Sequence, residues 1–217
     1  MLRKPSGCQG CPLWEKGKGF VPDAISAKDK IRFIGEAPGS TEVEKGSPFE
    51  GKSGFVLRSW LIKAVPELQL NVERGEASFA NTLRCLPPEI QGRPYPKGEE
   101  KVQAEACCRQ YDTPLDSVHT VVLLGESPQR AFFGAELNAE DASDKGQGRD
   151  VKGVTGRIGR VIEKGGIRYV FAPHPAYILR QPALVQHGQE ALRIASNTER
   201  TVEPDYMDWA TALGVMA

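Results

Sequence analysis

Four short runs of apolar and β-branched residues recur along the chain. They are Ile31–Ile34, Ser78–Leu83, Thr120–Leu124 and Tyr169–Ala172. The first and third runs are apolar almost throughout, which is typical of strands that are buried on both faces of a parallel sheet. The pattern therefore predicts a parallel sheet at the centre of the molecule.

Between and after these runs, apolar residues recur at helical spacing. The predicted helices are Phe55–Val65, Glu99–Tyr111, Pro128–Phe133 and Ala183–Ile194. Strands that alternate with helices are joined by right-handed crossovers. We therefore expect an α/β fold with three layers, α/β/α, around a central, mainly parallel four-stranded sheet. Ligand sites in such folds form where loops leave the carboxyl ends of the strands.

Two stretches lack a core pattern. Residues 135–152 are rich in Gly, Asp, Glu and Lys, which predicts a surface loop. From about Ser196 onward the chain is polar, with isolated large apolar residues. A length of 217 residues suits one domain with a tail. We expect a domain over residues 1–195 and a C-terminal tail over residues 196–217.

The charge balance gives no global sign of a nucleic-acid partner, because the formal net charge is zero. Cations are nevertheless concentrated in one segment, in which Glu163 is the only carboxylate. They are Arg157, Arg160, Lys164, Arg168 and Arg180. This segment could be a nucleic-acid contact or simply a solvated basic face.

No apolar run approaches the ~18–20 residues that span a bilayer. Residues 1–10 are polar and lack the apolar core of a signal peptide. We therefore expect a cytoplasmic protein without a membrane partner.

Five cysteines stand out in such a chain. Cys8 and Cys11 form a C-x-x-C pair, Cys85 stands alone, and Cys107 and Cys108 are adjacent. In the cytoplasm this pattern favours metal binding or catalysis over a disulfide framework. Four cysteine ligands suit either zinc or an iron–sulfur cluster.

The segment Gly46–Ser53 matches the phosphate-binding pattern G-x-x-x-x-G-K-S and precedes a predicted helix. A phosphate-binding loop should follow a strand directly, whereas the nearest predicted strand ends well before Gly46. Pro48 removes a backbone N–H from the loop, and Phe49 adds a large ring. A nucleotide-binding protein is therefore the weaker alternative.

Three residues have side chains suited to binding a base. The Asn81 amide offers one acceptor and two donors, although Asn is also common in turns. The Phe49 ring could stack on a flipped base or pack in the core. His174 lies between Pro173 and Pro175 after the last predicted strand, where an imidazole N–H could stabilise developing negative charge.

Taken together, five segments resemble the family 4 uracil-DNA glycosylases, which contain an iron–sulfur cluster. They are Gly35–Gly39 (GEAPG), Gly46–Gly54 (GSPFEGKSG), Asn81–Pro88 (NTLRCLPP), Leu124–Gly125 and His174–Pro182 (HPAYILRQP). Their order and spacing cover residues 8 to about 195. The combination is specific although no single segment is, and the match of Gly46–Ser53 to the phosphate-binding pattern is then coincidental.

The resemblance implies a uracil-DNA glycosylase fold and hydrolysis of the N-glycosidic bond of uracil flipped out of DNA. It implies catalytic roles for His174 and Glu36, with His174 donating to uracil O2. Uracil would be bound by Gly35, Ala37, Phe49 and Asn81, and DNA by Tyr177, Leu179 and Arg180. Asn81 would pair with the N3–H and O4 edge. Tyr177–Arg180, including Ile178, would wedge into the duplex.

Other glycosylase families have an Asp at the position of Ala37, where it holds the attacking water. In this chain Glu36 or backbone carbonyl groups would hold the water instead. The partner would be uracil-containing DNA, and the protein a monomer. The alternative from another functional class is a catalytically inactive DNA-binding relative, although Glu36, Phe49, Asn81 and His174 are all retained.

By the same resemblance, Cys8, Cys11, Cys85 and Cys108 would hold a [4Fe–4S] cluster with a structural role. Cys108 is favoured over Cys107 because Cys108–Tyr111 has the sequence CRQY, which matches the family's C-R-x-Y context. The interval from Cys85 to Cys108 is longer than in the family pattern, owing to an insertion around residues 91–98.

Overall fold

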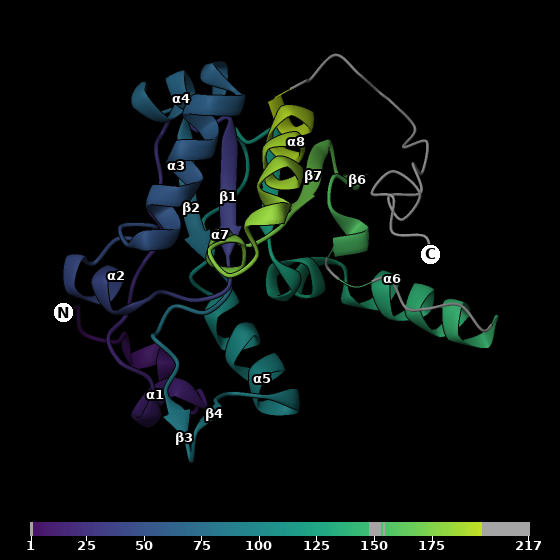
Figure 1. Ribbon diagram of the computed structural model, residues 1–217. Coiled ribbons are helices and arrows are strands. Elements are labelled where there is room, and N and C mark those ends of the chain that lie inside the picture. The colour runs from purple at the N-terminus through teal and green to yellow at the C-terminus, as the bar shows by residue number, and fades with distance from the viewer. Residues whose placement is uncertain (1, 148–152, 154, 197–217) are drawn as a thin grey trace.

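A five-stranded sheet forms the centre of the computed structural model, which describes residues 2–147, 153 and 155–196 (Figure 1). Its strands, in spatial order, are β2 (Ala77–Asn81), β1 (Ile31–Gly35), β5 (Thr120–Leu124), β7 (Ile167–Ala172) and β6 (Val161–Lys164). The first four are parallel, which confirms the predicted sheet. The predicted tail over residues 197–217 lies outside the described residues.

The fifth strand, β6, was not predicted. It runs antiparallel to β7 at the edge of the sheet, and the two strands are joined by Gly165 and Gly166. Both glycines adopt positive φ, as a two-residue hairpin turn requires. Because an edge strand does not need to be apolar on both faces, β6 contains charged residues. It therefore lacks the continuous apolar run by which the other strands were predicted.

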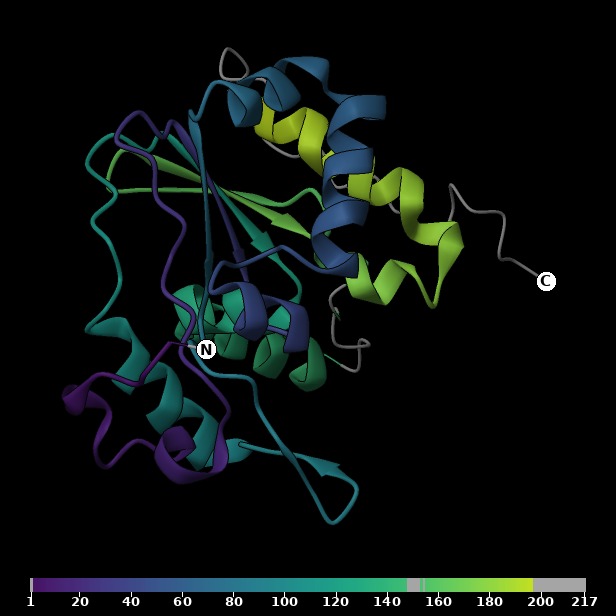
Figure 2. The same ribbon diagram turned by 90° about the vertical axis from the view of Figure 1, so that its left-hand side faces the viewer.

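Helices cover both faces of the sheet, which confirms the three layers (Figures 1 and 2). One face packs against α3 (Lys52–Ala64), α4 (Pro66–Glu73), α7 (Pro175–Ile178) and α8 (Val185–Ser196). The other face packs against α6 (Glu126–Gly146). Successive residues of β5 show the alternation, since Val122 and Leu124 join the first core and Val121 and Leu123 the second.

The remaining elements lie mostly beyond the carboxyl edge of the sheet (Figure 1). They are η1 (Ser6–Cys8), α1 (Leu13–Lys16), α2 (Ser40–Lys45), β3 (Glu89–Ile90), β4 (Arg93–Pro94), α5 (Gly98–Arg109), η2 (Thr155–Arg157) and η3 (Pro182–Leu184). The exposed β3–β4 hairpin and the residues after it lie between Cys85 and Cys108, where the sequence analysis expects an insertion. No helix among the described residues has both the length and the apolar character needed to cross a membrane.

Helix α6 corrects the sequence-based prediction of a surface loop over residues 135–152. The helix continues to Gly146, beyond non-helical backbone angles at Phe133, so the loop prediction is wrong for residues 135–146. Leu137 is fully buried in the second core, which holds this half of the helix against the sheet. Residues 148–152 lie outside the described residues.

Ion pairs explain both the acidic second half of α6 and the predicted basic segment. Lys164 pairs with Glu136, and Arg160 with Glu140 at 2.5 Å. Arg157 pairs with Asp141, which also accepts from Arg130 at 3.0 Å. Three cations of the basic segment are thus paired with carboxylates of α6, so they do not form an uncompensated basic surface.

The contact between α3 and α8 generates a stability prediction. A Cβ on Gly188 of α8 would lie 2.8 Å from Trp60 Cζ3 of α3, so Gly188→Ala should destabilise the fold by about 1–3 kcal/mol. Gly134 of α6 has no atom within 4 Å of such a Cβ, and Gly134→Ala should stabilise by about 0.5–1 kcal/mol. Urea unfolding measures both changes; a Gly188→Ala variant as stable as wild type would contradict the close approach.

Candidate active site

The pairing of β1 determines where the site lies. Strand β1 is flanked by β2 on one side and by β5 on the other. The strands that follow β1 in the sequence are therefore added first on one side of it and then on the other. Crevices at such switch points are the usual ligand sites of open α/β sheets. Gly35 is the register partner of Asn81, and Leu124 of Ala172. The residues that follow these strands therefore meet at one edge.

Gly35, Asn81 and Phe49 are in direct contact. A Cβ on Gly35 would lie 2.6 Å from Asn81 Oδ1 and 2.9 Å from Phe49 Cζ. Any side chain at residue 35 would displace the amide or the ring. The structure thus brings together three of the residues predicted to bind uracil, and Gly35 contributes by its lack of a side chain.

Phe49 is held in a strained backbone conformation. Its φ is 59°, which is uncommon for a residue other than glycine. Its carbonyl oxygen accepts a 2.7 Å hydrogen bond from Arg58 Nη1, and a side chain on Gly54 would collide with that carbonyl. The ring is buried beside Phe79, with centroids 5.7 Å apart. Strain that the surroundings maintain is typical of functional positions.

Glu42 is a site residue that the sequence analysis missed. Its buried carboxylate accepts hydrogen bonds from Gly39 N and Gly51 N, both at 3.0 Å. It therefore ties the loop after β1 to the loop that carries Phe49. The spacing of Gly39 and Glu42 is that of a capping box, a signal that was present in the sequence.

The phosphate-binding alternative fails on the same loop. Residues 46–51 connect α2 to α3, so the segment follows a helix rather than a strand. Its Gly51 N–H already donates a hydrogen bond to the Glu42 carboxylate. This N–H is therefore not available to a phosphate. We therefore set aside the nucleotide-binding interpretation.

His174 lies at the N-terminus of α7, directly after β7. Its Nδ1 accepts a 3.1 Å hydrogen bond from Ala176 N, so the neutral ring carries its proton on Nε2. Burial lowers the pKa of His174 below its usual value, and Arg180 adds to the effect while Glu36 opposes it. A Cβ on Gly125 would lie 3.0 Å from His174 Cβ. Gly125, which follows β5, therefore packs closely against His174. His174 is thus a neutral Nε2–H donor.

Glu36 and Ala37 leave the strand edge in different directions. The exposed Glu36 carboxylate pairs with Lys101 of α5 at 2.5 Å. The Glu36 carbonyl accepts from Leu83 N at 2.8 Å and from Thr82 Oγ1 at 3.0 Å. Ala37 packs against the apolar cluster that contains the cysteines. This loop therefore links the strand edge to the cysteine region.

The predicted DNA-contacting residues lie on and after α7. Leu179 and Arg180 are exposed, whereas Tyr177 is half-buried against the first core. Ile178 is buried in that core, with 3% of its surface exposed. Ile178 thus faces the protein interior, and Leu179 is the exposed apolar side chain of the segment.

All five cysteines line one small cavity beyond the sheet edge. They are Cys8, Cys11, Cys85, Cys107 and Cys108. Four of them are buried free thiols and only Cys107 is half-buried. Lys4 fixes the N-terminal side of the cavity, because its Nζ donates to the carbonyls of Leu13, Trp14 and Gly17 at 2.5–2.7 Å.

The chemistry of these thiols reflects burial. Burial raises the pKa of Cys108 to about 12 and that of Cys85 to about 11. As free thiols they are therefore neutral near pH 7, and a bound cation would be needed to stabilise their thiolates. No group of three His, Cys, Asp or Glu side chains among residues that the structure describes is arranged to hold a single metal ion.

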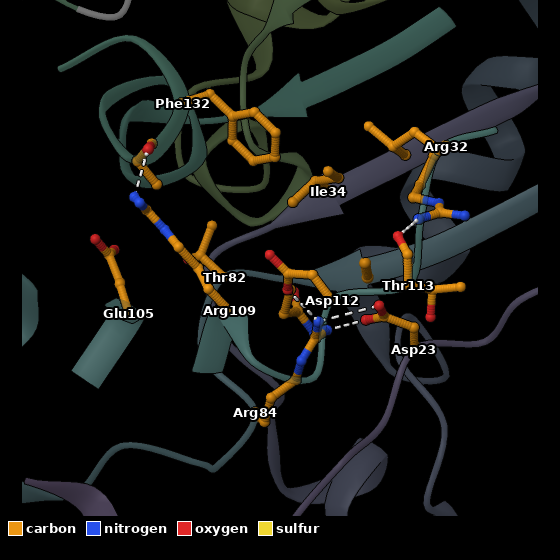
Figure 3. Close-up of a pocket in the computed structure, with 14 residues that line it drawn as sticks. Asp23, Arg32, Ile34, Thr82, Arg84, Glu105, Arg109, Asp112, Thr113 and Phe132 are labelled. Atoms are coloured by element: carbon orange, nitrogen blue, oxygen red, sulfur yellow. Dashed lines mark hydrogen bonds and ion pairs between the residues drawn. The ribbon is translucent and has the colours of Figure 1, made fainter. Parts of the chain in front are cut away.

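A larger cavity of about 310 Å³ opens on the α5 and α6 side of the sheet (Figure 3). Asn81 and Thr82 reach its wall, but Gly35, Phe49 and His174 do not line it. Its charged lining residues are balanced: Arg32, Arg84 and Arg109 face Asp23, Glu105 and Asp112. Nothing in this balance selects a ligand of either charge.

Comparison with known proteins gives consistent matches. A model of the uracil DNA glycosylase superfamily matches residues 22–196. A type-4 uracil-DNA glycosylase of Pyrobaculum aerophilum is 32% identical over 203 residues, covering 91% of this chain and 93% of that protein. One from Archaeoglobus fulgidus is 29% identical, with coverages of 85% and 84%. A solution NMR structure from Methanosarcina acetivorans superposes with a TM-score of 0.47 at 10% identity, covering 82% of this chain and 97% of that one.

The state of His174 can be measured directly. In ¹⁵N NMR, His174 should be neutral at pH 7 with its proton on Nε2, and it should titrate below ~6.5. Because its folded-state pKa is lowered, neutral His174 contributes stability above its unfolded pKa, and that stability is lost as pH falls through the folded pKa. His174→Gln assigns the signal. A proton on Nδ1, or a titration above pH 7, would refute this state.

Proposed function

The chain belongs to the uracil DNA glycosylase superfamily and to its type-4 group, and from this membership we propose that it excises uracil from DNA. The reaction hydrolyses the N-glycosidic bond of a flipped-out uracil and leaves an abasic site. The observation that carries the proposal is the contact of Asn81 and Phe49 over Gly35, at the strand edge from which His174 also emerges.

Asn81 and Phe49 provide recognition of the base. The Asn81 amide can accept from uracil N3–H and donate to O4, whereas cytosine presents the reversed pattern. Phe49 offers its ring as a stacking surface for a base removed from the helix. The absence of a side chain at Gly35 leaves room for both of these groups, and we assign Gly35 and the Ala37 backbone to the same binding surface.

His174 stabilises the leaving group. Cleavage of the glycosidic bond leaves negative charge on uracil, part of it on O2. A neutral Nε2–H donor fixed in advance stabilises that charge without first having to reorient. A protonated imidazole is unnecessary, and burial together with Arg180 disfavours it. The role is therefore electrostatic rather than general-acid catalysis.

We assign Glu36, whose negative charge acts on His174, to the positive sugar and the attacking water. The carbonyl of Glu36 is already bonded to Thr82 and Leu83, which supports the side chain rather than this carbonyl as the group that holds water. Exposed Leu179 would fill the gap left by the flipped nucleotide. Arg180 would contact a phosphate, and Tyr177 would support both.

Four buried cysteines fit a [4Fe–4S] cluster, in which each thiolate binds a different iron. Cys8, Cys11, Cys85 and Cys108 are the proposed ligands, since Cys107 is less buried. A site built around four irons need not bring three side chains within reach of one ion. When bound, the cluster would supply cross-links between the N-terminal segment, the loop after β2 and α5.

The catalytic assignment predicts large losses of rate from single substitutions. Asn81→Ala and His174→Ala should each lower the single-turnover rate of uracil release by about 10²–10³-fold, because each removes a hydrogen bond at the base. The wild-type rate should not fall as pH rises above 7, since the neutral imidazole is the active form. Release of uracil from a labelled oligonucleotide measures both effects.

His119→Ala is the matched control for this assay. His119 is exposed at the opposite, amino-terminal end of β5, so its loss should leave the rate unchanged. Binding of His174→Ala to an abasic duplex should remain close to wild type, because the product lacks the charge that His174 serves. Wild-type rates in Asn81→Ala, or equal losses of chemistry and product binding in His174→Ala, would reject the assigned roles. Binding without uracil release by wild type would favour an inactive relative.

The cluster predicts iron content and colour. Anaerobically purified protein should absorb near 400 nm and contain about four irons. Cys107→Ser should retain this iron and Cys108→Ser should lose it, as measured by metal analysis. Zinc in place of iron would exclude the cluster, and the reverse pattern in the two variants would make Cys107 the ligand.

A further inference from the structure

Arg84 is buried next to a proposed cluster ligand, Cys85, and carries a charge that needs compensation. It is among the largest fully buried side chains in the described part of the chain, with 2% of its surface exposed. A buried guanidinium is costly unless carboxylates and other acceptors surround it. Its partners therefore reveal what this residue holds together.

The polar contacts of Arg84 reach two other parts of the cysteine region, the N-terminal segment and the end of α5. Its backbone N–H points at Cys108 Sγ, 3.4 Å away, and its carbonyl accepts from Val21 N at 2.7 Å. Its guanidinium binds both carboxylate oxygens of Asp23, with Nη2 to Oδ2 at 3.0 Å. Nη2 also donates to Asp112 Oδ1 at 2.6 Å. The side chain thus bridges two carboxylates from distant parts of the chain.

The bridged segments are the ones that carry the cysteines. Asp23 belongs to the N-terminal segment that follows Cys8 and Cys11, and Asp112 follows Cys108 just after α5. Arg84 itself precedes Cys85. The planar guanidinium fork fixes the direction of each carboxylate as well as its distance, which a lysine would not do.

Figure 3 shows the guanidinium of Arg84 between Asp23 and Asp112 at the wall of the larger cavity. Arg84 also lines the small cavity of the cysteines. Arg84 is therefore the member of the ion-pair group that lines both cavities. Its members lie outside the catalytic contacts of Gly35, Phe49 and His174.

We propose that Asp23, Arg84 and Asp112 form a brace that positions the cysteine-bearing segments for the cluster, with Arg84 as the positioning residue. The inference rests on the proposed cluster and concerns its retention rather than uracil chemistry. The brace aligns the three segments through protein contacts alone. The cluster is then bound by ligands that are already in place, and it is released slowly because no segment can move away independently.

Cluster release tests the brace. Purified holoprotein is placed in excess EDTA, and the decay of absorbance near 400 nm is followed together with iron content. Arg84→Gln should lose the cluster about 10–100-fold faster than wild type, matching the loss of metal affinity typical when groups that orient metal ligands are removed. Arg84→Lys should be intermediate at most, because it keeps the charge but not the fork.

Arg157→Gln is the matched control. Arg157 is also a buried arginine, with 3% exposed, and its partner Asp141 lies on α6. If the loss of either arginine only weakens the fold, thermal stability should fall in both variants. Cluster release should then be unchanged at temperatures where far-ultraviolet circular dichroism shows that the protein is still folded. Equal release rates in Arg84→Gln and Arg157→Gln would overturn the brace.

Asp112→Asn covers the case in which Arg84→Gln does not fold. The Asp112 side chain is 51% exposed and Arg84 keeps Asp23, so this variant loosens one arm of the brace only. It should release the cluster faster than wild type while remaining folded, and a wild-type release rate would contradict the brace. If the wild-type protein contains no iron, both the proposed cluster and the proposed brace are wrong. The proposed excision of uracil is tested separately, by the release of uracil from DNA.

Discussion

The parallel pairing of β1 with both β2 and β5 is the constraint on which the rest of the structure depends. Parallel strands end at the same edge, so the loops after them are forced into one crevice. Gly35 and Asn81 are register partners there, and Gly35 leaves room for the Asn81 amide and the Phe49 ring. A shift of this register by one residue would turn Asn81 to the opposite face of the sheet and separate it from Phe49.

Rigid positioning recurs at each part of the site. Glu42 binds two backbone N–H groups of different loops, Arg58 holds the carbonyl of Phe49, and Ala176 fixes the proton of His174 on Nε2. These contacts come from backbone groups, the buried Glu42 carboxylate and the half-buried Arg58 guanidinium. A donor that is aligned before the reaction loses no energy to reorganisation when charge develops. The local strain at Phe49 is part of the same arrangement.

Charge compensation organises the parts of the molecule that lie away from the strand edge. Carboxylates of α6 neutralise Arg157, Arg160 and Lys164, and Asp23 with Asp112 neutralises Arg84. These cations are therefore compensated inside the molecule, in a chain whose formal net charge is zero. This pairing leaves Arg180, beside the proposed catalytic residue, as an exposed cation of the segment that was predicted to be basic.

The sequence alone determined the four parallel strands, the main helices and the order of the motifs, because apolar periodicity and glycine positions are local properties. It also indicated Phe49, Asn81 and His174, since each side chain has chemistry that suits a base. Only the tertiary structure decided that residues 135–146 are helical, that Ile178 faces the core and that Arg84 joins three segments. These outcomes depend on partners distant in the chain. A carboxylate or an arginine has the same local pattern whether it is solvated or paired, and only the fold brings its partner to it.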